Sequence, residues 1–135
     1  LDMKKAVAKT GRITFSTAQP GPSDRPEFHN ATPARWGDVV IQRKGTPTSY
    51  HLSVVMDDAM QNITHVTRGC DMQAATDIHV LLQFLLNLPA PIYTFHKLIL
   101  DKNSAKLSKS KGSTTLKDLQ KAGWTANAVR AHLGF

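Results

Sequence analysis

The sequence predicts an α/β fold, with a small mixed sheet, flanking helices and a short helical tail. Three observations lead to this prediction. Runs rich in β-branched residues lie within 38–68 and 92–100, a leucine-rich segment at 76–87 has helical spacing, and two segments with helix caps follow a lysine-rich stretch. The 135 residues have the size of one domain.

The first 35 residues are expected to form a helix and a connecting loop. A short helix is predicted from Asp2 to Lys9, with Asp2 as its N-cap and Gly11 as its stop. Residues 19–34 contain four prolines, which interrupt regular backbone hydrogen bonding. This stretch is therefore predicted to be a loop that crosses the surface.

Three strands in a meander are expected next. Residues 38–43 and 50–56 are rich in β-branched and apolar side chains, and they flank a predicted turn at 45–48. A third strand is predicted at 63–68 and ends at Arg68.

Helical spacing begins at Thr76. Apolar residues at i, i+3, i+4, i+7 and i+8 form one face, namely Ile78, Leu81, Leu82, Leu85 and Leu86. Pro89 and Pro91 end this helix, and a further strand is predicted at 92–100. The tail is predicted to contain helices at 115–122 and 125–134, each opened by a threonine N-cap.

Cysteine and histidine usage gives no sign of a metal site or a disulfide. Cys70 is the only cysteine, so an internal disulfide is excluded and a reducing cytoplasm is the expected location. The histidines at 51, 65, 79, 96 and 132 lack the spacing of metal ligands, and we interpret them as surface or core residues. We expect no zinc, no membrane partner and a monomer.

The formal net charge of +7 favours a polyanionic partner, because lysines and arginines that contact phosphates release counterions. A basic surface that only promotes solubility would give the same charge. The charge alone leaves both interpretations open.

The segment Lys106-Leu107-Ser108-Lys109-Ser110 resembles the KMSKS loop of class I aminoacyl-tRNA synthetases. Such a loop suits the chemistry, because negative charge develops on phosphate oxygens when a carboxylate attacks the α-phosphate of ATP, and mobile ammonium groups can stabilise it. Five residues of this kind are also typical of an ordinary solvated loop, so the interpretation depends on the rest of the chain.

Two upstream segments supply that context. Gly-Thr-Pro-Thr-Ser-Tyr-His-Leu-Ser-Val-Val-Met-Asp-Asp at 45–58 and Ile-Thr-His-Val-Thr-Arg-Gly-Cys-Asp at 63–71 look like the glutamate-specific branch of this class. The resemblance covers about 36–134 with all motifs in order. It implies that 36–135 is the carboxyl half of a Rossmann-like catalytic domain that activates glutamate, and that ATP, with Mg, is its second substrate.

Two residues fall on glutamate ligands of the family. Tyr50 matches a tyrosine that contacts the glutamate, and Arg68 matches an arginine that holds one of its carboxylates. The residues alone allow other interpretations: Tyr50 as a half-buried strand tyrosine, and Arg68 as a strand-end arginine paired with a nearby aspartate, Asp57, Asp58 or Asp71. The resemblance favours the ligand roles.

Five residues fall on positions of the family that meet ATP. Lys106 and Lys109 match the two signature lysines, so they are the expected catalytic residues and phosphate contacts. Asp71 matches a position that flanks the nucleotide, and Leu98 and Ile99 match a strand whose backbone meets the adenine. Asp71 could equally supply the negative charge at the start of the following helix.

The sequence lacks a His-x-Gly-His element, where the phosphates bind in this class, and it lacks a cysteine-rich zinc knuckle. We therefore expect it to be the carboxyl half of a longer protein and to be inactive alone.

Two members of the family compete as the function. One charges tRNA(Glu) and carries a large helical anticodon domain, whereas the glutamyl-Q member transfers glutamate to queuosine in the anticodon of tRNA(Asp) and ends soon after the signature loop. Only residues 111–135 follow this loop, and Val54 and the break at 88–91 also favour the glutamyl-Q member. A non-catalytic basic RNA-binding module remains a third alternative.

Overall fold

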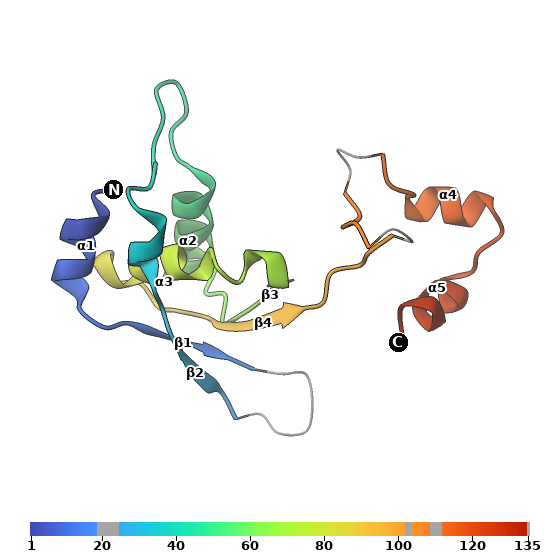
Figure 1. The fold of residues 1–135 in the computed structure, drawn as a ribbon, viewed down its shortest axis with the longest axis horizontal. Helices are drawn as coiled ribbons and strands as arrows, with labels where there is room; N and C mark the ends of the chain where they lie inside the picture. The colour runs from blue at the N-terminus through green and yellow to red at the C-terminus, as the bar shows by residue number, and fades with distance from the viewer. Residues whose placement is uncertain (19–24, 102–103, 109–111, 135) are drawn as a thin grey trace. The chain divides into compact units, whose positions relative to one another are not determined.

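The computed structural model describes residues 1–18, 25–101, 104–108 and 112–134 (Figure 1). The chain divides into two units, Leu1–His96 and Lys97–Phe135, and each is described by itself. None of the helices in these described ranges is long and apolar enough to cross a membrane.

A four-stranded mixed sheet forms the base of the first unit (Figure 1). Its strands are β1 (Thr14–Thr17), β2 (Glu27–Asn30), β3 (His65–Gly69) and β4 (Ile92–His96), in the order β2-β1-β4-β3. The pair β1 and β2 is antiparallel, whereas β4 is parallel to both β1 and β3. The α/β prediction is confirmed, and so are the strands at 63–68 and 92–100, although the second ends at His96.

Strands β1 and β2 were not predicted from the sequence. β2 lies inside the stretch expected to be a loop, so that prediction was wrong for 27–30, and 19–24 lies outside the described residues. Within this sheet β2 pairs with β1 alone, and an edge strand tolerates a neighbouring proline such as Pro26. β1 is only four residues long, but its Phe15 and Thr17 are buried.

The segment 50–56 is a helix, and the predicted strand there was wrong. Helix α2 (Tyr50–Met60) follows Ser49, whose backbone is extended as at an N-cap. Val55 is buried and belongs to the same apolar cluster as Ile78 and Leu82. Packing of this helical face outweighs the strand propensity of the neighbouring valines.

The predicted strand at 38–43 is also wrong. Val39 exchanges two backbone hydrogen bonds with Leu1, of 2.7 and 3.2 Å, and the Asp38 carboxylate accepts the Met3 N–H at 2.9 Å. The segment is thus tied to the beginning of the chain, and its only bridge, Arg43 to Thr46, closes a turn.

Helix α3 (Thr76–Leu85) lies at the centre of the first unit and confirms the predicted helix at 76–87. It connects the parallel strands β3 and β4, as parallel pairing requires. Its Val80 and Leu81 share the main core with α1 (Met3–Thr10) and with the sheet, through Met3, Ala6, Ile13, Phe15 and Tyr93. Asp2 caps α1 as predicted, accepting the Lys5 N–H at 3.0 Å.

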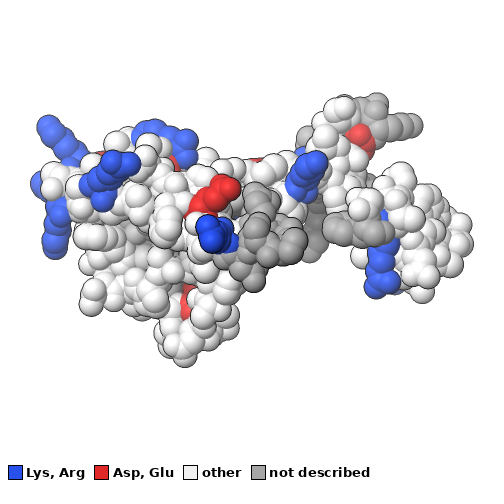
Figure 2. All heavy atoms as spheres, turned by 90° about the horizontal axis from the view of Figure 1, so that it is seen from below, with Lys and Arg blue, Asp and Glu red and all other residues white. Residues whose placement is uncertain are grey.

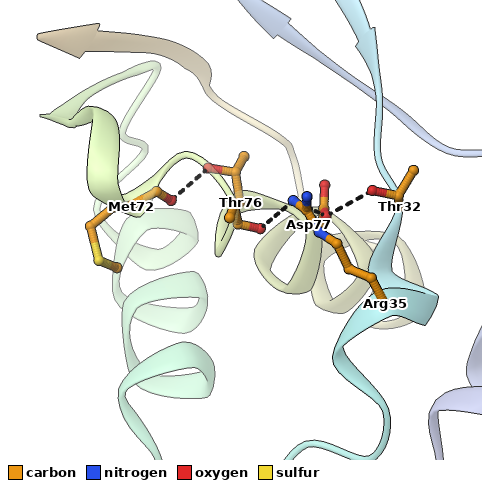
Figure 3. Close-up of polar contacts among 6 residues, drawn as sticks. Thr32, Arg35, Met72, Thr76 and Asp77 are labelled. Carbon is orange, nitrogen blue, oxygen red and sulfur yellow. Dashed lines mark hydrogen bonds and ion pairs between the residues drawn. The ribbon is translucent and has the colours of Figure 1, made fainter.

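A buried carboxylate fixes the beginning of α3 (Figure 3). Asp77 pairs with Arg35 at 2.6 Å and accepts the Thr32 hydroxyl at 3.2 Å. Arg35 belongs to the 3₁₀ turn η1 (Pro33–Trp36), and it also donates to the Ala74 carbonyl at 3.2 Å. A negative charge in the first turn is favoured by the helix dipole, so these contacts join η1 to a stabilised helix end.

The second unit contains α4 (Leu116–Lys121) and α5 (Ala126–Leu133), as predicted. Thr115 and Asp118 form a capping box on α4, and Thr125 caps α5 by accepting the Ala128 N–H at 3.1 Å. Gly134 ends α5 at φ 83°, a left-handed conformation that glycine adopts readily.

Leu81→Ala is expected to lower the free energy of unfolding by about 2–5 kcal/mol, because the side chain is 0% exposed and its removal leaves a cavity in the core. Leu86→Ala is the matched control, since Leu86 is 44% exposed, and it should cost about 1 kcal/mol or less. Urea unfolding of both variants measures the difference, and equal losses would contradict the described core.

Candidate functional site

Four polar or aromatic side chains from three elements meet beside α3. Arg68 of β3 donates from Nη1 to Nδ1 of His79 at 2.9 Å, and Nε2 of His79 lies 3.0 Å from Nδ1 of His51. The Tyr50 ring lies 5.8 Å from the His79 ring and 5.6 Å from the His51 ring, centroid to centroid. We call Tyr50, His51, Arg68 and His79 the Arg68 cluster.

The direction of these hydrogen bonds follows from the chemistry of the donors. A guanidinium can only donate, so Nδ1 of His79 must be an unprotonated acceptor. A neutral His79 then carries its proton on Nε2 and donates it to Nδ1 of His51. The chain of donation therefore runs from Arg68 through His79 to His51.

The electrostatics of the cluster keep His79 neutral. Burial, then the positive charge of Arg68, then His51, lower the pKa of His79 from 6.5 to about 3. Burial and Arg68 likewise lower the pKa of His51. The cluster thus holds one fixed positive charge, on Arg68.

The guanidinium of Arg68 also lies over an aromatic ring. Its Cζ lies 5.1 Å from the centroid of the buried Tyr93 ring of β4, within cation–π range. Burial raises the pKa of Asp58 of α2, and the nearby positive charge of Arg68 opposes this increase. Among the described residues no carboxylate forms an ion pair with Arg68, so its predicted pairing with Asp57, Asp58 or Asp71 is not found.

The structure changes the setting of two predicted residues. Tyr50 begins a helix and is 57% exposed, so it is not a half-buried strand residue. Asp71 lies in the 3₁₀ turn η2 (Cys70–Met72), before α3 begins, and Asp77 is the acidic residue in the first turn of α3. The alternative role of Asp71 as that helix charge is therefore wrong.

Three predicted ATP contacts lie in the described part of the second unit. Ile99 accepts a hydrogen bond from the Leu107 N–H at 3.1 Å, and Lys106 forms an antiparallel bridge with Leu100. Leu98 is half-buried and lies beyond the end of β4. Lys109, the second signature lysine, lies outside the described residues, as does Ser110.

His51 and His79 are the site residues that sequence reasoning missed. We interpreted both as ordinary surface or core histidines, and His79 is indeed in the core, 1% exposed. The available signal was its position inside the apolar run 78–82, because a buried polar side chain needs a hydrogen-bond partner.

No group of three or more His, Cys, Asp or Glu side chains in the described ranges is arranged to hold a metal ion. The face in Figure 2 shows lysines and arginines in separate groups, with few acidic side chains among them.

Comparison with known proteins decides the family. The sequence model of "tRNA synthetases class I (E and Q), catalytic domain" matches residues 27–134. The chain belongs to this family. The mixed sheet and flanking helices are accordingly part of a class I synthetase catalytic domain.

Two similar curated relatives carry the same name. The chain is 41% identical over 138 residues to the glutamyl-Q tRNA(Asp) synthetase of Rhodobacter capsulatus, covering 99% of this chain and 48% of that protein. It is 43% identical over 98 residues to the enzyme of the same name from a Synechococcus species, covering 73% of this chain and 32% of that one. The chain therefore spans half or less of the length of these relatives.

Solved structures agree with the family. The glutamate-tRNA synthetase of Elizabethkingia anophelis matches 84% of this chain with a TM-score of 0.57 and 27% identity, over 20% of its own length. The glutamate tRNA ligase of Elizabethkingia meningosepticum, crystallised with its amino acid, has the same TM-score and identity and covers 85% of this chain and 20% of its own.

The lowered pKa of His79 predicts that the free energy of unfolding falls as the pH drops from 6.5 toward 3. Between these pH values His79 is protonated in the unfolded chain but neutral in the folded chain. Its full contribution to the free energy of unfolding is therefore present above pH 6.5. The slope for one proton is about 1.4 kcal/mol per pH unit.

Urea unfolding of the chain and of His79→Leu between pH 7.5 and 4.5 checks this prediction. The variant should show a shallower slope than the wild-type chain, and the comparison cancels the other titrating groups. Equal slopes in the two proteins would contradict a neutral, buried His79.

Proposed function

We propose that the full-length protein activates glutamate with ATP and transfers the glutamyl group to queuosine in the anticodon of tRNA(Asp). The observation that carries this proposal is the gathering of Tyr50 and Arg68 around His79. The shared name of the curated relatives supports the choice of glutamate and of tRNA(Asp). Membership in a catalytic-domain family favours an enzyme over a non-catalytic basic RNA-binding module.

Arg68 and Tyr50 are proposed to bind glutamate. A guanidinium stays charged and offers a planar pair of N–H groups to a carboxylate, and the Tyr50 phenol can add a hydrogen bond. Tyr50 is exposed, and Arg68 uses Nη1 for His79, so both retain groups that can meet a ligand. The fixed positive charge of the cluster suits a substrate with two carboxylates.

Lys106 and Lys109 are proposed as the catalytic residues at the ATP phosphates. An oxygen of the glutamate α-carboxylate attacks the α-phosphate, the bond to the β-phosphate breaks, and glutamyl-adenylate and pyrophosphate form. Ammonium groups stabilise the charge that gathers on the departing pyrophosphate. Asp71, Leu98 and Ile99 are proposed to lie beside the rest of the nucleotide, and Mg would accompany ATP as substrate.

In the second step a hydroxyl of the queuosine cyclopentene diol attacks the activated carbonyl. An ester forms, AMP leaves with the bonding electrons, and the proton of the attacking hydroxyl is released to the solvent. The formal net charge of +7 suits an anticodon stem-loop, because phosphates bind lysines and arginines while a splayed nucleoside reaches the adenylate.

Transfer to tRNA(Glu) is the second candidate. The solved structures that resemble this chain carry the name glutamate-tRNA synthetase or glutamate tRNA ligase, which favours it. Both candidates share glutamate activation and differ only in the acceptor.

Arg68→Ala in the full-length protein should weaken the use of glutamate by about 1.5–3 kcal/mol, the scale of a charge-assisted hydrogen bond, and leave the KM for ATP nearly unchanged. Glutamate-dependent exchange of pyrophosphate into ATP measures both. Arg12→Ala is the control, since Arg12 is an exposed arginine bonded to Asn30. An unchanged KM for glutamate would remove Arg68 from the site.

The position of the transferred glutamate separates the two candidates. Full-length protein is incubated with labelled glutamate, ATP and bulk tRNA, and the product is cut with a ribonuclease. We expect the label in the anticodon fragment of queuosine-containing tRNA(Asp), and none in tRNA from cells that cannot make queuosine. Label at the 3′ end of tRNA(Glu) would establish the second candidate instead.

A further inference from the structure

We propose that His79 is a positioning residue, which holds the Arg68 guanidinium in the orientation that meets the substrate carboxylate and is itself held by His51. This inference rests on the proposed function, because it assigns a role within the same glutamate site. It adds two histidines to the site, one of them buried in the central helix.

The first argument is that Arg68 is restrained in two directions. Nη1 donates to His79 at 2.9 Å, and Cζ lies over the Tyr93 ring, 5.1 Å from its centroid. One hydrogen bond at a nitrogen and one contact with an aromatic ring limit the movement of the group. An arginine without them would lose side-chain entropy on binding a ligand, which weakens binding.

The second argument is that His79 can serve as a fixed anchor. It is 1% exposed and lies in α3, between buried residues on either side in sequence. Both ring nitrogens are used, Nδ1 by Arg68 and Nε2 by His51. The ring therefore has a single orientation and tautomer that satisfy both partners.

The third argument concerns the groups that face His79. Arg68 of β3 and His51 of α2 contact it, and Tyr50 of α2 lies beside it. Burial, then Arg68, then His51, lower its pKa to about 3, so the ring stays neutral throughout the neutral range. The neutral ring can therefore accept from Arg68 at Nδ1 while it donates from Nε2 to His51.

The kinetic test compares two substitutions of His79 in the full-length protein. His79→Leu fills similar space and offers no acceptor, whereas His79→Asn keeps an oxygen near the place of Nδ1. We expect His79→Leu to raise the KM for glutamate about tenfold or more with the KM for ATP within twofold, and His79→Asn to restore most of the loss. Thermal unfolding of each variant is recorded beside the kinetics.

The control is His65→Leu, which removes an exposed histidine from β3, the strand that carries Arg68, and should leave both KM values unchanged. A purely structural His79 would alter the KM of glutamate and ATP alike, or would give the same KM for glutamate in the Leu and Asn variants. Either result overturns the positioning role. Should His79→Leu fail to fold, His51→Leu replaces it, with an expected rise of a few-fold in the KM for glutamate alone.

Nuclear magnetic resonance of the histidine ring nitrogens tests the relay without relying on activity. We expect His79 in the wild-type protein to show an unprotonated Nδ1 and a protonated Nε2 from pH 5.5 to 8. A protonated Nδ1 overturns the relay even if glutamate is activated. Absence of any glutamate-dependent exchange in the wild-type protein would instead overturn the proposed function, and the positioning role with it.

Discussion

Burial of α3 from Thr76 to Gln83 is the constraint on which the first unit depends. Every residue from Thr76 to Gln83 is buried, because the helix packs against α1 and the sheet through one cluster and against α2 through another. Its polar side chains therefore need protein partners, since an unpaired buried polar group costs about 1–3 kcal/mol. Each one reaches a different element: Thr76 bonds the Met72 carbonyl, Asp77 bonds Arg35 and Thr32, His79 bonds Arg68 and His51, and Gln83 bonds the Tyr93 hydroxyl. These bonds also locate β3, η1 and α2 around the helix.

This arrangement couples the fold to the site. Arg68 lies in β3, where its backbone is paired with Phe95 of β4, so its Cα is fixed by the sheet while its guanidinium is fixed by α3. Tyr50 and His51 arrive from the first turn of α2, and that helix is held in place by Val55 against α3. Two independent packing contacts therefore position the two proposed glutamate ligands relative to one buried ring. Loops alone would not give this precision, because their local stability is lower than that of core elements.

The sequence predicted α3, both helices of the tail and strands β3 and β4, because each has a strong local signal: five apolar residues at helical spacing, threonine caps, or a short β-branched run. The strand predicted at 50–56 was wrong. The valines there favour a strand, but the segment is a helix that buries Val55 against Ile78 and Leu82. Sequence reasoning missed β1, since four residues in which only Phe15 and Thr17 are buried give too short an alternation to recognise. Tyr50 and Arg68 were predicted as ligands by resemblance, but the contacts of His79 were not predicted, because Arg68 and His51 are distant in sequence and only the tertiary fold brings them to its ring.

The choice of histidine as the partner of Arg68 has an electrostatic consequence. An aspartate in its place, as the sequence alone suggested with Asp57, Asp58 or Asp71, would hold the guanidinium by a stronger bond but would also neutralise it. A substrate carboxylate would then meet a pair with no net charge and would compete with a tethered anion for the same N–H groups. A neutral imidazole accepts only one N–H and leaves the charge of Arg68 uncancelled.

The burial of the His79 imidazole is tolerated because both nitrogens are bonded, whereas a buried carboxylate would require the guanidinium as its own permanent counterion. The protein uses that second solution at the other contact of α3, where Asp77 binds Arg35 and the ion pair serves the fold. Arg35 thus meets a carboxylate of this helix, whereas Arg68 meets a neutral acceptor, and this difference suits the proposed role of Arg68 in binding a carboxylate.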